Sequence, residues 1–274
     1  MKKFNNFSFK GIMFHYFHDN KFFKRSPGSI NSKHLEKIIL KVGRKNILDP
    51  LDFIEKLKNR SIKHNHVCLT FDDTLRCQYK IALPILKKYK IKSFFFVTTS
   101  IFTSRPNLIE VYRYFRDNHF RNINQYYIDF NKELKKIYSE KKIITFIKKN
   151  NKIIKKKKKL YPFYSLEDIK FREIRDKLLD TKKYEKIMKF MFVKKNFDYK
   201  KKIKQLYFNK KNLKTISNMG HIIGLHSHSH PYSISKLSYN KQAKEFRTNK
   251  KILEKITKKN VISASFPRGD YNAP

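Results

Sequence analysis

Short segments that are almost wholly apolar alternate along this chain with longer segments of helical periodicity. The apolar segments are predicted strands, at residues 11–15, 67–71, 93–98, 221–225 and 261–266. Strands that are apolar on both faces and separated by helices usually pair in parallel, because the connecting helices cover the sheet. We therefore predict an α/β fold, either a parallel sheet or a (β/α) barrel. In such folds the chemistry is carried by residues at the carboxyl ends of the strands.

Predicted helices fill the intervals between these strands, at residues 33–42, 50–57, 81–89 and 240–258. The pattern changes between about residues 104 and 212, where lysines and aromatic residues accumulate in helical stretches such as 108–115 and 171–179. We predict a single domain over residues 1–274 with a helical, Lys-rich insertion at residues 105–212. Five consecutive lysines at residues 155–159 suit a solvated turn or helix end, and an anion-binding lid is the alternative.

The charge of the chain is strongly positive. Its 274 residues include 65 Lys and Arg against 22 Asp and Glu, a formal net charge of +43. Such a charge would suit a nucleic acid or an anionic membrane as partner. The charge is spread over the whole chain, however, and the excess of Lys, Asn, Ile, Phe and Tyr is expected from an AT-rich genome. Because no helix-turn-helix, zinc-finger or RNA-recognition signature accompanies it, a basic nucleic-acid-binding protein is the weakest alternative.

Cysteine usage and the N-terminal segment bear on location. Cys68 and Cys77 lack a C-x-x-C spacing, so a disulfide framework is not expected and a reducing compartment is the default. The basic N-terminal segment lacks the apolar core and cleavage site of a signal peptide. No segment approaches the roughly 20 apolar residues of a membrane span. We expect a soluble, cytoplasmic protein.

Two adjacent carboxylates, Asp72 and Asp73, follow the predicted strand at residues 67–71. Neighbouring carboxylates at the end of an apolar strand are costly unless positive charge lies beside them, and a divalent cation would supply it. One carboxylate could then bind the cation while the other acts as a general base toward water. The structural alternative is that the pair caps the next helix.

Three histidines, His226, His228 and His230, follow the predicted strand at residues 221–225. On a helical turn His226 and His230 share a face, whereas on a strand all three would point the same way. Imidazole is a common zinc ligand, and a cluster of three at a strand end is rarely structural. One carboxylate with two imidazoles leaves coordination positions open for water and substrate, which is typical of a catalytic metal site.

Both motifs resemble those of the NodB-type polysaccharide deacetylases, carbohydrate esterase family 4. Residues 67–100 resemble the first motif, in which T-F-D-D precedes a helix and a strand ending in F-F-V; residues 220–238 resemble the second, G-H-x-I-G-x-H-[ST]-x-x-H-P. The resemblance covers residues 10–104 and 212–274. It implies an irregular (β/α) barrel of about seven strands, with the later strands either missing at the C-terminus or lying in the predicted insertion.

The same resemblance implies the roles of individual residues. Asp72 corresponds to the catalytic base, and Asp73, His226 and His230 correspond to the ligands of a divalent metal. Zinc is the expected metal, and cobalt, nickel and manganese are alternatives. His228 falls on a variable position of the family motif.

Residues 265–272 (SFPRGDYN) are similar to a third family motif, F-x-Y-P-[FY]-G-x-Y-N. By this resemblance Pro267, Arg268 and Tyr271 contribute to substrate binding, and backbone amides near residues 267–269 hold the oxyanion. Arg268 stands where the family usually has an aromatic residue. It could steer an anionic sugar or pair with Asp72, or be an exposed loop arginine.

The family resembled here usually supplies its general-acid histidine from a motif near the C-terminus, but this sequence has no histidine after His230. Residues 12–19 resemble the L-M-Y-H-x-[IV] strand of permuted deacetylases, whose first strand supplies the acid histidine. His15 is then the candidate acid and His18 the reserve, with a buried structural histidine as the alternative reading.

Together these resemblances imply hydrolytic removal of an acetyl group from an N-acetylated sugar or polysaccharide. We expect the substrate to be a surface polysaccharide or its precursor, as in lipopolysaccharide or capsule biosynthesis. A catalytically degenerate homologue is one alternative. Another metal-dependent amidohydrolase, with His226 and His228 as ligands, is a second, although it leaves T-F-D-D unexplained.

Overall fold

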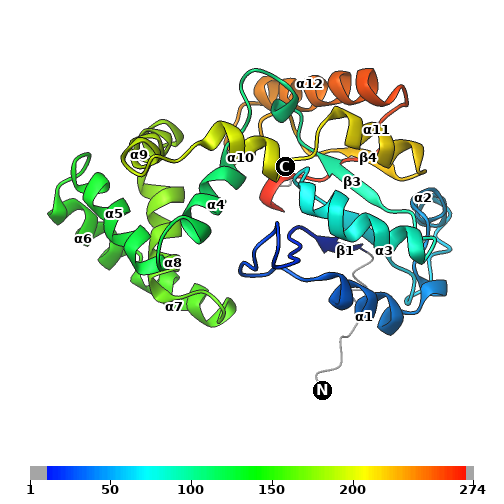
Figure 1. Cartoon of the computed structure of the whole chain (residues 1–274), viewed down its shortest axis with the longest axis horizontal. Helices are drawn as coiled ribbons and strands as arrows, with labels where there is room; N and C mark the ends of the chain where they lie inside the picture. The colour runs from blue at the N-terminus through cyan, green and yellow to red at the C-terminus, as the bar shows by residue number, and fades with distance from the viewer. Residues whose placement is uncertain (1–10, 270–274) are drawn as a thin grey trace. The chain divides into compact units, whose positions relative to one another are not determined.

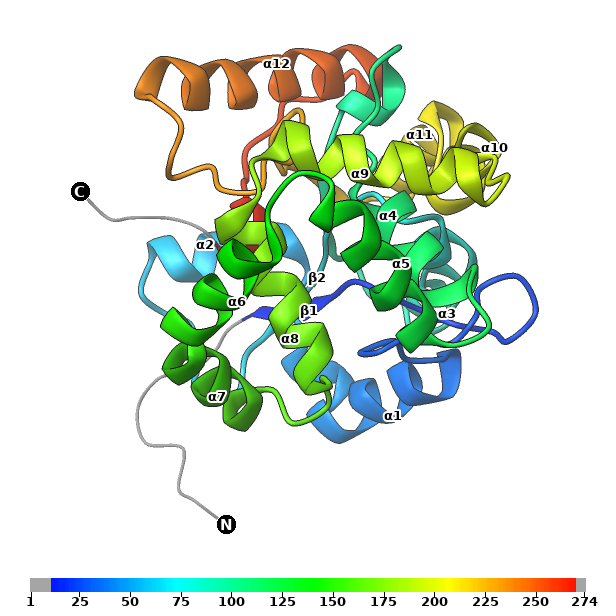
Figure 2. The ribbon, with the colours of Figure 1, turned by 90° about the vertical axis from the view of Figure 1, so that its left-hand side faces the viewer.

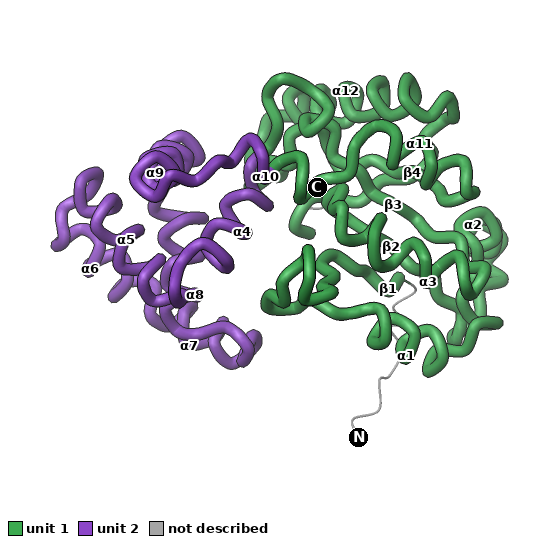
Figure 3. Tube along the Cα trace, viewed as in Figure 1, with its two compact units in different colours: residues 1–107, 203–274 green, residues 108–202 purple. Residues whose placement is uncertain are grey.

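The computed structural model describes residues 11–269. The chain divides into two compact units (Figure 3): unit 1 comprises residues 1–107 and 203–274, and unit 2 is Leu108–Lys202. The prediction of one domain with an insertion at residues 105–212 stays a prediction. No helix of the described residues is long and apolar enough to cross a membrane.

Unit 1 contains a four-stranded parallel sheet, which confirms the predicted α/β class (Figure 1). The strands lie in the order of the chain, β1-β2-β3-β4. Their bounds are β1 Gly11–Phe14, β2 Cys68–Phe71, β3 Phe94–Val97 and β4 Ile222–Leu225. β3 is buried along its whole length, as expected for a central parallel strand covered on both faces.

The segment at residues 261–266 forms only a single parallel bridge, between Ala264 and Leu225. Leu225 donates its N–H to Ser263 O at 2.8 Å and accepts from Ser265 N at 2.9 Å, so the segment runs beside β4. Gly224 permits this close approach, because a Cβ there would lie 2.5 Å from the Phe96 ring and 2.7 Å from Ser263 Oγ. The described residues thus form four strands rather than about seven, and the closed barrel stays a prediction.

Helices of unit 1 pack around the sheet, and four of them, at residues 32–42, 50–58, 83–88 and 239–257, lie close to the predicted positions. The helices are α1 Ser32–Val42, α2 Pro50–Lys58, α3 Leu83–Lys88, α11 Lys210–Asn218 and α12 Tyr239–Thr257, and α10 Tyr199–Leu206 contains the boundary with unit 2. Local signals fix several of their starts: Asn31 caps α1, Pro50 begins α2, and Asn209 forms a capping box with Asn212 at α11. α11 packs against α12, which packs against β4 (Figure 1). Figure 2 shows α12 above and α1 below the strands β1 and β2.

The register of the strands aligns their carboxyl ends. Phe14 pairs with Phe71, and Phe71 pairs with Phe95; these three rings stack across the sheet, with centroids 5.3 and 4.8 Å apart. β3 and β4 continue this alignment to the Val97–Leu225 pair. The residues that follow β1, β2 and β4 in the chain therefore emerge at the same edge of the sheet.

Unit 2 is wholly helical. Its helices are α4 Ile109–Asn118, α5 Ile123–Lys135, α6 Glu140–Lys149, α7 Asn151–Leu160, α8 Leu166–Glu173 and α9 Thr181–Lys194. Buried aromatic and sulfur-containing side chains form its core, among them Phe115, Tyr126, Phe130, Met188 and Phe192. The five lysines at residues 155–159 occupy the second half of α7, which fits their expected place at a helix end.

Candidate active site

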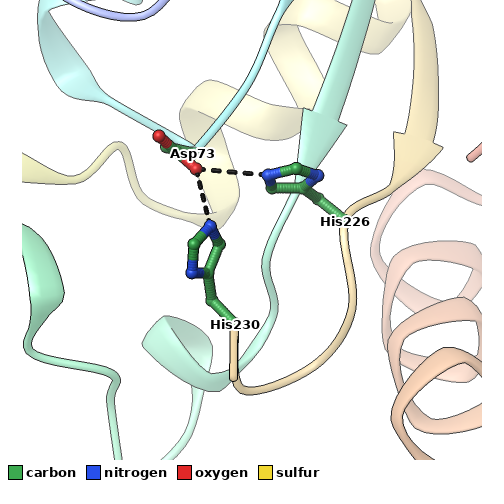
Figure 4. Close-up of side chains that lie close together, drawn as sticks. All are labelled: Asp73, His226 and His230. Carbon is green, nitrogen blue, oxygen red and sulfur yellow. Dashed lines mark ion pairs between the residues drawn. The ribbon is translucent and has the colours of Figure 1, made fainter. Parts of the chain in front are cut away.

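Three side chains from two distant segments converge at the carboxyl edge of the sheet (Figure 4). The Nε2 atoms of His226 and His230 lie 3.2 and 3.1 Å from the same oxygen, Oδ1 of Asp73. One ligand atom from each of the three lies within 4.8 Å of the others. Both histidines are buried, and the Asp73 side chain is only 13% exposed, so water screens this cluster weakly.

The backbone before and after Asp73 is bent into an uncommon conformation. Asp73 and Thr74 have positive φ angles of 75° and 62°, which cost on the order of 1–3 kcal/mol each for non-glycine residues. Thr74 is held by strand β3, because its Oγ1 accepts from Thr98 N at 2.9 Å. The turn directs the Asp73 carboxylate toward the histidine loop instead of letting it cap the following helix.

The loop after β4 is anchored by α12. His226 N donates to Asn249 Oδ1 at 2.9 Å, and Ser229 donates from both its N–H and its hydroxyl to Glu245, each at 2.7 Å. Within the loop, His230 N donates to Ser227 Oγ at 3.1 Å. These bonds fix the two imidazoles relative to one another before any ligand arrives.

His228 turns away from this cluster. Its Nδ1 atom lies 2.9 Å from Thr99 Oγ1, and its carbonyl oxygen accepts from the N–H groups of Thr99 and Ser100. The geometry therefore groups His226 with His230, and not with His228 as the amidohydrolase alternative requires.

The donor set fits a divalent cation. Nδ1 of His226 donates to the carbonyl oxygen of Ser265 at 2.9 Å, which leaves Nε2, the nitrogen beside Asp73, available to bind a cation. Two ligands of one tetrahedral zinc, each at ~2.0–2.1 Å, are themselves about 3.3 Å apart, close to the observed spacings. A carboxylate and two imidazole nitrogens are also suitable ligand types for zinc and its neighbours.

The pKa shifts of Asp73 and His226 agree with this fit. Burial by itself raises the pKa of Asp73, but its close contacts to His226 and His230 outweigh burial and hold that pKa well below its usual value. Burial by itself lowers the pKa of His226, but Asp73 and Asp72 raise it overall. The negative charge at Asp73 thus stabilises positive charge on His226.

Asp72 lies beside the cluster in a different environment. Its side chain is almost completely buried, and burial raises the pKa of its carboxyl. Oδ2 accepts from Ser265 Oγ at 3.2 Å and lies 4.0 Å from His226 Nε2, whereas the buried Oδ1 has no hydrogen-bond partner among the described residues. One oxygen is thus positioned and the other can accept a proton. The adjacent carboxylates Asp72 and Asp73 have opposite pKa shifts.

His15 reaches the same centre from β1. Its Nε2 lies 3.5 Å from Oδ2 of Asp73, and its side chain is 30% exposed. His18, the reserve candidate, is buried elsewhere: its Nδ1 lies 2.9 Å from Ser29 Oγ, and burial lowers its pKa. Of the two candidates, His15 is the one beside the cluster of Asp73, His226 and His230.

The third motif contacts the site through a residue that the sequence analysis did not select. Ser265 bonds both Asp72 and His226, whereas the Arg268 guanidinium lies 5.5 Å from the Tyr232 ring centroid and donates to Tyr232 O at 3.1 Å. Pro267 is buried in the short helical turn Pro267–Gly269. Tyr271 lies outside the described residues.

Two buried amides that sequence patterns did not reveal support the site. Nε2 of Gln78 donates to His15 O at 3.0 Å and to Asp72 O at 2.6 Å, linking the ends of β1 and β2. Asn249 links β3 to the histidine loop, donating to Val97 O at 2.9 Å and accepting from His226 N. No local signal identifies either residue, because each joins two segments that are distant from one another in the chain.

Solved structures share this fold. A deacetylase from Streptococcus pyogenes, PplD in complex with acetate, has a TM-score of 0.51 at 17% identity, covering 96% of this chain and 74% of its own. IcaB from Ammonifex degensii has a TM-score of 0.50 at 13% sequence identity, and the match covers 97% of this chain and 76% of IcaB. A de-N-acetylase from Aggregatibacter actinomycetemcomitans has a TM-score of 0.52 at 10% sequence identity, and the match covers 96% of this chain and 80% of that protein. At these identities the likeness establishes the fold alone.

Family membership rests on sequence. A search of curated proteins gives no significant match. The family model for polysaccharide deacetylase matches residues 59–164 and 163–274, which together span well over half of the chain and include both the carboxylate pair and the histidine loop. The chain therefore belongs to the polysaccharide deacetylase family.

Proposed function

We propose that the protein is a metal-dependent hydrolase that removes the acetyl group from an N-acetylated sugar of a surface polysaccharide or its precursor. The observation that carries the proposal is the convergence of His226 and His230 on one oxygen of Asp73, with Asp72 adjacent. Family membership supports deacetylation. The name of the de-N-acetylase with the same fold supports an N-linked acetyl group.

Asp73, His226 and His230 would hold the divalent cation, with zinc as the expected ion and cobalt, nickel or manganese as alternatives. When bound, such an ion supplies Lewis acidity toward a carbonyl oxygen and toward water. The protein contributes the fixed positions of the two imidazoles, through the bonds of His226 to Ser265 and Asn249.

Asp72 acts as the general base in this proposal. It accepts a proton from the water that attacks the acetyl carbon, and burial raises its pKa and so makes it a stronger base. The bond from Ser265 holds one carboxylate oxygen, and the other, Oδ1, has no hydrogen-bond partner among the described residues and would accept the proton.

His15 is the proposed general acid, which donates a proton to the departing sugar nitrogen. Its position beside Asp73 and its partial exposure give it access to both the reacting centre and solvent.

A backbone amide of the Pro267–Gly269 turn would stabilise the oxyanion. Pro267, Arg268 and Tyr271 are proposed to contact the sugar. We further propose that the protein is cytoplasmic and acts in lipopolysaccharide or capsule biosynthesis.

The test is to measure metal content and acetate release for Asp73→Ala and His226→Ala. We expect both variants to purify with little metal and to release acetate at least about 100-fold more slowly, because each loses one of three ligands. The matched control is His228→Ala, which lies in the same loop but bonds Thr99. Full metal content in both ligand variants would refute the site, and loss of metal in His228→Ala with retention in His230→Ala would favour the amidohydrolase alternative.

A further inference from the structure

A stripe of lysines runs along the exposed face of helix α7 in unit 2. Lys152, Lys155, Lys156 and Lys159 follow a spacing of three and four residues and are all exposed, whereas Ile154, on the opposite face, is 1% exposed. The other two lysines of the run turn inward: Lys157 pairs with the buried Glu173, and Lys158 donates to loop carbonyls. The five-lysine run is therefore sorted by helical periodicity into an outer charged stripe and an inner structural pair.

An apolar loop continues directly from this stripe. Residues 160–166 join α7 to α8, at the lower edge of unit 2 in Figure 3, and four of their apolar side chains are exposed. The exposed fractions are 61% for Leu160, 45% for Tyr161, 63% for Phe163 and 43% for Leu166. Exposed large apolar side chains gathered in one loop mark an interaction site more often than scattered single ones do.

The loop is held in a defined conformation despite this exposure. Lys158 Nζ donates to Pro162 O at 2.9 Å and to Tyr164 O at 2.5 Å, and Ser165 caps α8 by accepting from Asp168 N at 3.0 Å. The Tyr164 ring packs 4.1 Å from the Arg172 guanidinium and 4.5 Å from the Phe163 ring. The backbone is thus fixed by polar contacts while the apolar side chains point outward.

We propose that this surface, the lysine stripe of α7 together with the loop at residues 160–166, docks unit 2 on a lipid bilayer that contains anionic headgroups. The lysines would face the headgroup phosphates, and the loop side chains would insert at the boundary between headgroups and acyl chains, where aromatic residues are favoured. Charge alone gives weak, easily screened attachment, and apolar burial alone gives little selectivity. Their adjacency on one ordered surface is what fits an anionic bilayer.

A nucleic acid fits this surface less well. Its phosphates would also attract the lysines, but Leu160, Pro162 and Leu166 have no aromatic face on which a base can stack. Burying these apolar side chains lowers the free energy only when they leave water for another apolar medium. The proposal concerns unit 2 alone and does not depend on the reaction proposed for unit 1.

The test is co-sedimentation of the full-length protein with vesicles of phosphatidylcholine, with and without phosphatidylglycerol. We expect binding to the anionic vesicles only. The triple variant Lys155→Gln, Lys156→Gln, Lys159→Gln should bind about 100-fold more weakly, since each lysine near an anionic surface contributes roughly a factor of five. Phe163→Ser should weaken binding about tenfold, through lost apolar burial. Glutamine keeps the helix propensity of lysine, and unchanged thermal unfolding would show that the fold is retained.

Matched controls remove the same charge and the same apolar exposure elsewhere. Lys200→Gln, Lys201→Gln, Lys204→Gln makes an equal change of charge on α10, and Leu40→Ser replaces an equally exposed side chain, 65%, on α1. Both controls should bind within about threefold of the wild type, because neither change alters the lysine stripe of α7 or the loop at residues 160–166. Equal binding to neutral and anionic vesicles, equal losses in the α7 and α10 variants, or a Phe163→Ser defect in binding an RNA oligonucleotide but not vesicles would each overturn the proposal.

Discussion

The hydroxyl of Ser265 donates to Oδ2 of Asp72 at 3.2 Å, although the two residues are 193 positions apart in the chain. The same serine accepts through its carbonyl oxygen from Nδ1 of His226. One residue beside β4 therefore fixes both the proposed base and one proposed metal ligand.

Asp72→Asn should retain metal and lose activity. Asparagine keeps the shape of the side chain and can still contact Ser265, but it cannot take a proton from water. We expect kcat to fall by about 10²–10⁴, the usual contribution of a general base. Metal analysis and acetate release measured on the same preparation provide the check, with Asp73→Asn as the comparison that should lose metal. A metal-free Asp72→Asn protein would mean that Asp72, too, is a ligand.

Ser265→Ala should lower kcat by about tenfold or more, because a hydrogen bond to a charged carboxylate contributes roughly 1.5–3 kcal/mol. The substitution keeps the backbone carbonyl that orients His226, so metal content should be unchanged. Ser263→Ala is the control in the same segment, since the buried Ser263 hydroxyl has no hydrogen-bond partner among the described residues. If the two variants have the same kcat, Ser265 does not position Asp72 for the reaction.

His15→Ala should lower kcat by about 10²–10⁴ with little change in KM, since a general acid acts on the leaving nitrogen in the transition state. The control is His18→Ala, in which the lost histidine contacts Ser29 and not Asp73. This control should unfold at a lower temperature while the folded protein keeps its kcat. Steady-state kinetics with a small N-acetylated sugar oligomer tests both variants, and equal kcat losses would argue against His15 as the acid.

Gln78→Met should reduce both stability and kcat. The side chain is fully buried, and its loss would leave the carbonyls of His15 and Asp72 without this donor, at a cost of about 1–3 kcal/mol in the free energy of unfolding. Because those carbonyls fix the proposed acid and base, kcat should fall at saturating substrate. Gln242, on α12, donates to Leu237 O at 2.8 Å, and Gln242→Met should leave kcat unchanged. Urea unfolding and kinetics give the two readouts.

His221 should make the protein less stable in acid. Burial, and then the charge of Lys92, lowers its pKa from 6.5 to about 4 in the folded protein, where Nδ1 accepts from Ser93 N at 3.1 Å. Between pH 6.5 and 4 the unfolded chain therefore binds more protons than the folded protein. The contribution of neutral His221 to the free energy of unfolding is complete above about pH 6.5 and is lost as the pH falls toward 4. The loss is on the order of 3 kcal/mol.

Urea unfolding at a series of pH values checks this prediction. His221→Gln keeps a possible acceptor for Ser93 N but does not titrate, so the difference in the free energy of unfolding between wild type and variant should shrink as pH falls. A difference that stays constant between about pH 7 and 4 would show that His221 titrates normally in the folded protein.

The sequence alone determined the α/β class, four of the strands and the two segments that carry the site. These features are local: apolar runs mark buried strands, capping residues such as Asn31 mark helix starts, and the Asp and His motifs follow strands in the chain. The resemblance of the motifs also selected His226 and His230 over His228, because it assigns individual positions.

Only the tertiary structure decided how these segments meet. The strand order and register bring His15, Asp73 and His226 to one edge, and they leave His18 beside Ser29. Ser265, Gln78 and Asn249 escaped prediction because each bonds to residues distant in the chain, and their polar side chains carry no periodic signal. Hydrophobic periodicity reports which face of an element is buried, whereas a polar contact between two elements depends on their packing in three dimensions.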